Sequence, residues 1–219
     1  MPVVVVTDSS ARVPAGLLAE FDIRVVPLHV LVDGRDLRDG VDEFPVDLYQ
    51  RAGVTTAGAS PDQLAAVYRQ ALHDSEGDGV VAVHISGALS STLGVAEHAA
   101  AGVGGAVRVI DSKSAAMGTG FVALAAARAA RDGASLDDVA GQAESTVGRV
   151  SAYLVVQRLE DRRRSGRLGT AASWLGTALA APDAAWRAHH GAAAQKRHAA
   201  APALRELRRR AGIFARGRQ

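Results

Sequence analysis

The chain has 219 residues, of which 48% are hydrophobic, 22% charged and only 4% aromatic, with a formal net charge of +2. This composition is typical of a globular protein of one or two domains whose core is built from Val, Leu and Ala. The absence of cysteine excludes disulfides, cysteine nucleophiles and thiolate metal sites. No stretch is long enough to span a membrane and no signal peptide precedes the first strand pattern, so we expect a cytoplasmic protein without stable membrane insertion.

Strand and helix patterns alternate along the chain. β-Branched runs predict strands at 3–7, 23–32 with a break at Pro27, 80–85, 107–110 and 152–156. Helical patterns occupy 13–21, 46–52, 61–73, 90–101, 118–130 and 136–149, whereas 36–44 and 55–60 are expected to be loops. Pro61 suits the first position of its helix, with Ser60 as the N-cap. Such alternation predicts an α/β protein with a parallel, doubly wound sheet.

Two serine-rich turns follow buried-strand patterns. One is at 8–10 and the other at 86–92. Ligands of open α/β sheets bind at the carboxyl ends of the strands, and hydroxyls with helix N–H groups suit an oxyanion. The turns therefore predict a small ligand with an anionic head group. The alternative is that these serines only cap helices.

The character of the sequence changes near Ala181. From Pro182 onward there are nine Lys/Arg residues and two acidic ones, a net charge of +7, which leaves −5 for residues 1–181. This basic stretch lacks base-stacking aromatics and a recognisable motif, so nucleic acid is not expected as a partner. Its Ala/Arg/His/Gly/Pro composition resembles GC-rich coding DNA read out of frame. We therefore interpret 182–219 as a non-native or disordered tail that follows a frameshift.

Five stretches together resemble the DegV family. In chain order they are Thr7-Asp8-Ser9-Ser10-Ala11, Thr56-Ala57-Gly58-Ala59-Ser60-Pro61, Ile85-Ser86-Gly87-Ala88-Leu89-Ser90-Ser91-Thr92, Asp111-Ser112 with Gly118 and Gly120, and Arg164-Ser165-Gly166-Arg167-Leu168. Each is weak alone, but their common order and spacing are specific. The resemblance implies a larger α/β lobe at 1–150 and the start of a smaller, incomplete α/β lobe at 151–181. The family's usual C-terminal region is not recognisable, so none of the histidines of the tail is matched to the family's head-group histidine.

The resemblance also implies a function. DegV proteins are bacterial fatty-acid-binding proteins, and some are carrier subunits that present the fatty acid carboxylate to a separate fatty acid kinase. The chain is therefore expected to bind a long-chain fatty acid between its lobes, to have no enzymatic activity of its own, and to need no cofactor or metal. The residues themselves leave two alternatives open: a hydrolase or transferase acting on a small phosphate- or carboxylate-bearing substrate, and a non-functional fragment.

Five residues are candidates for contact with the ligand. Thr56 and Ser90 are the first choice as carboxylate donors, followed by Ser86 and then Ser9. Arg167 suits a carboxylate or phosphoryl group by its charge and forked geometry. Each serine or threonine could instead be an ordinary turn residue, and Arg167 a solvated arginine. His84, inside a strand pattern, is interpreted as a core histidine, and Asp8 and Asp111 as caps.

Overall fold

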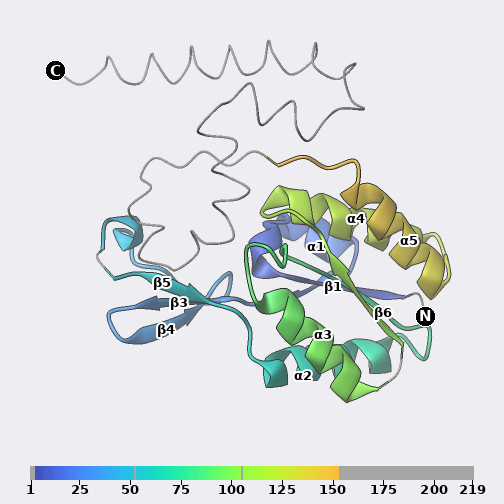
Figure 1. The fold of residues 1–219 in the computed structure, drawn as a ribbon, viewed down its shortest axis with the longest axis horizontal. Coiled ribbons are helices and arrows are strands. Elements are labelled where there is room, and N and C mark those ends of the chain that lie inside the picture. The colour runs from blue at the N-terminus through green and yellow to red at the C-terminus, as the bar shows by residue number, and fades with distance from the viewer. Residues whose placement is uncertain (1–2, 52, 105, 153–219) are drawn as a thin grey trace, which may run out of the picture. The chain divides into compact units, whose positions relative to one another are not determined.

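A parallel sheet of four strands forms the centre of the protein. The computed structural model describes residues 3–51, 53–104 and 106–152. The strands β1 (Val4–Asp8), β2 (Arg24–Val26), β6 (Val80–His84) and β7 (Val107–Asp111) lie in the order β2-β1-β6-β7, all parallel (Figure 1). The predicted parallel sheet is confirmed. The predicted strand at 152–156, Arg167 and the tail at 182–219 lie outside the described residues.

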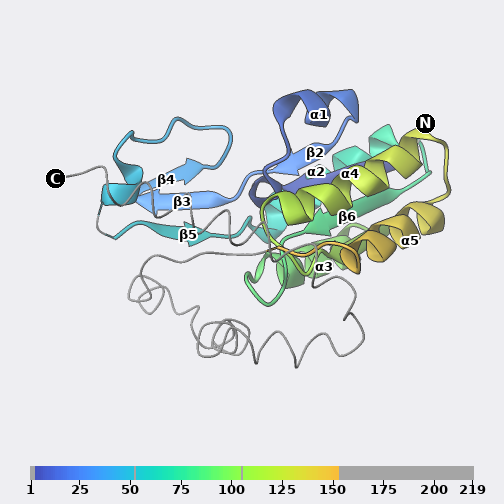
Figure 2. The ribbon, with the colours of Figure 1, turned by 90° about the horizontal axis from the view of Figure 1, so that it is seen from above.

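Helices cover both faces of this sheet. The helices α1 (Ala15–Glu20), α4 (Met117–Arg131) and α5 (Leu136–Val147) pack on one face, and α2 (Pro61–Asp74) and α3 (Thr92–Val103) on the other (Figures 1 and 2). Successive strand residues point to opposite faces of the sheet. Val5 therefore packs in the core beneath α1, α4 and α5, and Val4 and Val6 pack in the core beneath α2 and α3. Both faces of β1 and β6 are therefore buried, which explains their uninterrupted apolar sequences.

The start of α2 follows the sequence rules closely. The Ser60 side chain accepts from the Gln63 N–H and the Gln63 side chain accepts from the Ser60 N–H, which forms a capping box with Pro61 in the first turn. The predicted N-cap is confirmed.

A second sheet lies beyond the carboxyl ends of the parallel strands (Figures 1 and 2). It is antiparallel, with β3 (His29–Val32) between β4 (Arg35–Arg38) and β5 (Thr55–Ala57). The chain enters it directly from β2 through Pro27, and Val32, Leu37 and Leu48 form its small core.

Three local predictions need correction here. The loops expected at 36–44 and 55–60 contain β4 and β5, and the helix expected at 46–52 is only the 3-10 turn η2 (Leu48–Gln50). β4 and β5 have three or four residues each and are mostly polar, so they carry no hydrophobic alternation. Their pairing depends on the β3–β4 turn, where Asp33 and Gly34 both have positive φ, as a two-residue hairpin requires.

Candidate functional site

The two serine-rich turns meet at the carboxyl edge of the parallel sheet. β1 and β6 are direct neighbours, and from β1 the strand order runs one way to β2 and the other way to β6. Such a switch point is where doubly wound sheets bind ligands. The turn after β1 contains the 3-10 helix η1 (Ser9–Ala11), and the turn after β6 leads into α3.

An acid of the chain itself occupies the switch point. One oxygen of Asp8, Oδ2, accepts hydrogen bonds from His84 Nδ1 and from the Ile85 N–H, each at 3.0 Å. Its other oxygen accepts from the N–H and the hydroxyl of Ser10. Burial alone would raise the pKa of the Asp8 carboxyl, but the hydrogen bonds from His84, Ser10 and Ile85 lower that pKa below its ordinary value. Asp8 is therefore a fully buried carboxylate that uses the N–H groups expected to bind a ligand.

His84 connects this carboxylate to α2. Its Nε2 atom lies 2.7 Å from the Tyr68 hydroxyl, and both side chains are fully buried. Burial, and then the charge of Asp8, raise the pKa of Tyr68 above its ordinary value, so the phenol keeps its proton. His84 is a satisfied core histidine, as the sequence predicts. Its second nitrogen faces the Tyr68 hydroxyl, and because both side chains are fully buried, this pair presents no nucleophile to a substrate.

Ser9 is used to attach the antiparallel sheet. Its hydroxyl donates to Asp39 Oδ2 at 2.8 Å and accepts from the Leu28 N–H at 3.0 Å. Arg12 holds the other oxygen of Asp39 at 3.0 Å. Because the single hydroxyl hydrogen of Ser9 goes to Asp39, this predicted ligand residue has no donor left for a ligand in this arrangement.

The turn after β6 is different, because its hydroxyls retain hydrogens. Ser86 Oγ accepts from the Ala88 N–H at 3.2 Å, and its own hydrogen has no acceptor among the described residues. Ser90 Oγ lies 2.9 Å from Thr92 Oγ1, so one of these two hydroxyls donates to the other. The hydroxyl that accepts keeps its own hydrogen available to donate. The first N–H groups of α3 have no partner inside the helix. This turn therefore presents hydroxyl donors beside a helix N-terminus.

The antiparallel sheet comes close to the same turn. A Cβ atom placed on Gly58, just after β5, would lie 2.8 Å from Thr92 Oγ1, so the two backbones are in close contact there. Thr56 is two residues from Gly58 and exposed, and Ser90 bonds Thr92. The structure thus brings the segments of Thr56, Ser86 and Ser90 near one another, while Arg167 lies outside the described residues.

The next strand end holds the turn in place. The Ser86 N–H donates to the Ser114 carbonyl at 2.9 Å, and the Gly87 N–H to Asp111 Oδ1 at 3.4 Å. Asp111 also accepts from the Lys113 N–H at 2.8 Å, a contact within the loop before α4. The expectation that Asp111 caps a helix is wrong, because the N-cap of α4 is Ala116. Successive N–H groups of the turn after β6 are therefore held by both neighbouring strands.

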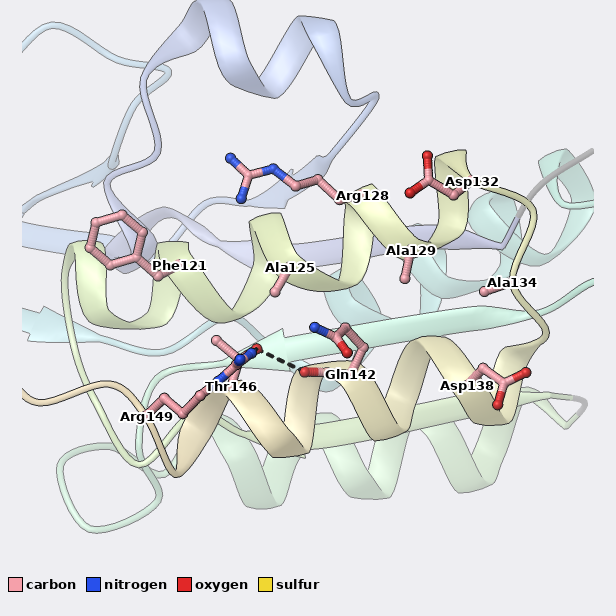
Figure 3. A pocket seen from close by; sticks show the side chains of 10 residues that line it. All are labelled: Phe121, Ala125, Arg128, Ala129, Asp132, Ala134, Asp138, Gln142, Thr146 and Arg149. Atoms are coloured by element: carbon pink, nitrogen blue, oxygen red, sulfur yellow. Dashed lines mark hydrogen bonds between the residues drawn. The ribbon is translucent and has the colours of Figure 1, made fainter.

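A surface pocket lies elsewhere, between α4 and α5 (Figure 3). It measures about 640 Å³ and is lined by alanines with Phe121, Arg128, Asp132, Asp138 and Arg149 around them. None of the predicted ligand residues lines it. Within 3–51, 53–104 and 106–152, no group of three His, Asp or Glu side chains could hold a metal ion, and no helix is both long and apolar enough to cross a bilayer.

Comparison with known proteins identifies the family. A family model described as "Uncharacterised protein, DegV family" matches residues 2–181. The chain belongs to the DegV family. A DegV domain-containing protein of Mycobacterium tuberculosis is 61% identical over 180 residues, covering 82% of this chain and 64% of the relative. This DegV chain therefore spans about two thirds of the length of such curated relatives.

Solved DegV structures share the fold. A fatty-acid-binding DegV protein of Thermus thermophilus superposes with a TM-score of 0.68 at 38% identity, covering 82% of this chain and 65% of that one. A stearic-acid-binding protein of Eubacterium ventriosum gives 0.64 at 27% identity, with 76% and 60% covered. These similarities confirm the predicted family and the α/β fold, and they connect the fold with lipid ligands in those proteins.

Two contributors to this edge were not predicted. Tyr68 lies on α2, far from either serine turn in sequence, and Asp39 lies in a segment expected to be a loop. No local signal distinguishes Tyr68 from other core aromatics. For Asp39, the acidic composition of 36–44 is the only signal, and it does not select this residue from its neighbours.

Proposed function

We propose that this chain binds a long-chain fatty acid and holds its carboxylate at the turn after β6. Ser86 and Ser90 would donate from this turn, with Thr56 from β5. Arg167 would supply a positive charge. Ser9 would contribute by holding the antiparallel sheet through Asp39 rather than by touching the ligand.

One observation carries this proposal: the hydroxyl-rich turn after β6 keeps hydrogens to donate, beside the start of α3 and next to β5. A carboxylate needs two or three such donors, and charge-assisted hydrogen bonds are stronger than neutral ones. The neighbouring turn offers no equivalent site, because Asp8 and Asp39 already accept from its serines.

The acyl chain would supply most of the affinity. Burial of each CH₂ group contributes about 0.8 kcal/mol, so a long chain contributes far more than a head group held by a few hydrogen bonds. The head-group site would then mainly set the orientation of the carboxylate. A fixed orientation suits presentation of the carboxylate to a partner fatty acid kinase. We include in the proposal that such a kinase binds the loaded carrier and phosphorylates the carboxylate.

The test is direct measurement of lipid by two methods. Native mass spectrometry of the full chain, purified without detergent, should show a co-purified fatty acid. Calorimetry of the delipidated protein should show saturable binding of at least one C14–C20 fatty acid. A folded, delipidated protein that binds none of them would overturn the proposal. Addition of a fatty acid kinase and ATP to the loaded protein should then yield acyl phosphate, and no transfer would refute the kinase step alone.

A further inference from the structure

We propose that His84 is a positioning residue for the fatty acid head group, acting through Asp8 on the turn at 85–91. This rests on the function proposed above. Three fully buried polar side chains, Tyr68, His84 and Asp8, form a hydrogen-bonded row that ends at the first N–H group of that turn. A buried strand end needs no such row for packing, since burial of polar atoms is costly unless they are paired.

Asp8 can only accept, so a proton of His84 lies on Nδ1, at 3.0 Å from Oδ2. In the neutral imidazole, Nε2 then accepts, and the Tyr68 hydroxyl donates to it at 2.7 Å. Tyr68 therefore fixes the tautomer and ring orientation of His84 from α2, and each donor in the row has an acceptor.

The same oxygen of Asp8 receives both His84 and the turn. Oδ2 accepts from the Ile85 N–H at 3.0 Å, the residue that follows His84 along the chain. The next two N–H groups of the turn are held by Ser114, which follows β7, and by Asp111 at the end of β7. His84 thus helps to fix the Asp8 oxygen that links the turn to β1. Without its donor, Ser10 still holds Oδ1, but Oδ2 is held by the Ile85 N–H alone among the described residues, so it can shift away from Ile85. Ser86 and Ser90 would then lose their common orientation toward a ligand.

His84 itself does not touch the ligand in this proposal, because it is fully buried beneath the sheet edge. The effect of a substitution should therefore depend on which nitrogen is kept. In His84→Asn, the amide nitrogen can take the place of Nδ1 and still donate to Asp8. In His84→Gln, the amide takes the place of Nε2, so the hydrogen bond with Tyr68 is kept and the donor to Asp8 is lost.

Thr7→Val provides a matched control. Thr7 is fully buried in β1 beside Asp8, and its hydroxyl donates to the Val83 carbonyl across the same strand pair at 2.8 Å. Its loss removes one buried hydrogen bond without touching the turn. It should lower stability about as much as the His84 variants do, which separates stability from positioning.

The experiment measures palmitate or oleate affinity of the full chain and amide hydrogen exchange without ligand. We expect His84→Gln to weaken fatty acid affinity about tenfold, which is the effect of one lost hydrogen bond. The affinity of His84→Asn should stay within about threefold of wild type, and that of Thr7→Val within about twofold. Exchange at 85–91 should rise in His84→Gln but not in Thr7→Val. Equal losses in the two His84 variants, or an equal loss in Thr7→Val, would refute the positioning role. If the parent protein binds no fatty acid, the proposed function fails, and the exchange rates alone decide whether His84 orders the turn.

Discussion

The turn after β1 and the turn after β6 lie side by side at one edge of the parallel sheet, but their hydroxyls have different partners. After β1, Ser9 donates to Asp39 and Ser10 to Asp8, and both acceptors are carboxylates of this chain. After β6, the Ser86 hydroxyl bonds only as an acceptor among the described residues. A serine turn at a strand end is available to an anionic ligand only if no acid of the protein itself reaches it. The first turn is structural, and the second is the turn at which we propose that the ligand binds.

The largest expected effect comes from removing the acid at the switch point. Asp8→Ala leaves His84, Ile85 and Ser10 without their acceptor in a buried place. We expect the free energy of unfolding to fall by about 3–5 kcal/mol, because each buried donor that loses its acceptor costs about 1–3 kcal/mol. Urea denaturation followed by circular dichroism measures this. A loss below about 1 kcal/mol would show that the Asp8 contacts contribute little to stability.

The pH dependence tests the same contact. The pKa of Asp8 is lowered in the folded protein, so its ionised form contributes stability above the unfolded value of 3.8, and this is lost as pH falls through the lower folded pKa. The stability difference between the wild type and Asp8→Asn should therefore be constant near neutral pH and shrink below about pH 4. Because the asparagine keeps the size of the side chain, it controls for the cavity in Asp8→Ala.

The second prediction concerns affinity in the other turn. The double substitution of Thr56→Ala with Ser90→Ala should weaken fatty acid binding by about 1–3 kcal/mol, since the bound carboxylate loses two donors. Stability should change less than affinity. Calorimetry with one fatty acid measures the difference, and unchanged binding by the double variant would show that these hydroxyls do not hold the head group.

Ser9→Ala is the matched control for this comparison. It removes the donor to Asp39 and the acceptor for Leu28, both part of the attachment of the antiparallel sheet. We expect a stability loss of about 1–2 kcal/mol with affinity nearly unchanged. Affinity that fell as far as in the double variant would place Ser9 in the binding site instead.

The sequence predicts the parallel sheet and its helices better than the antiparallel sheet and the partners of the turn residues. Long β-branched runs such as 80–85 and a capped helix such as the one from Pro61 carry their own signals, and both are confirmed. β4 and β5 do not, because three or four polar residues become strands only when β3 pairs with them. Likewise, the partners of Ser9 and Ser10 depend on where the chain folds back. No local pattern therefore distinguishes a serine turn whose hydroxyls are bonded to acids of the protein from one whose hydroxyls can still donate.

The smallest expected effect on stability and affinity comes from substitutions of two glycines that border the turn after β6, Gly58 and Gly87. A Cβ at Gly58 would meet Thr92 Oγ1 at 2.8 Å, whereas one at Gly87 would meet the Leu93 Cδ2 atom at 2.8 Å. The leucine end can rotate away, but Thr92 is a short, fully buried side chain that bonds Ser90. Gly58→Ala should therefore cost about 1 kcal/mol of stability, the lower range for overpacking, and also lower fatty acid affinity by shifting Ser90. Gly87→Ala should cost less than half of that and leave affinity unchanged. If both variants behave alike in urea denaturation and calorimetry, the Gly58–Thr92 contact does not couple β5 to the binding turn.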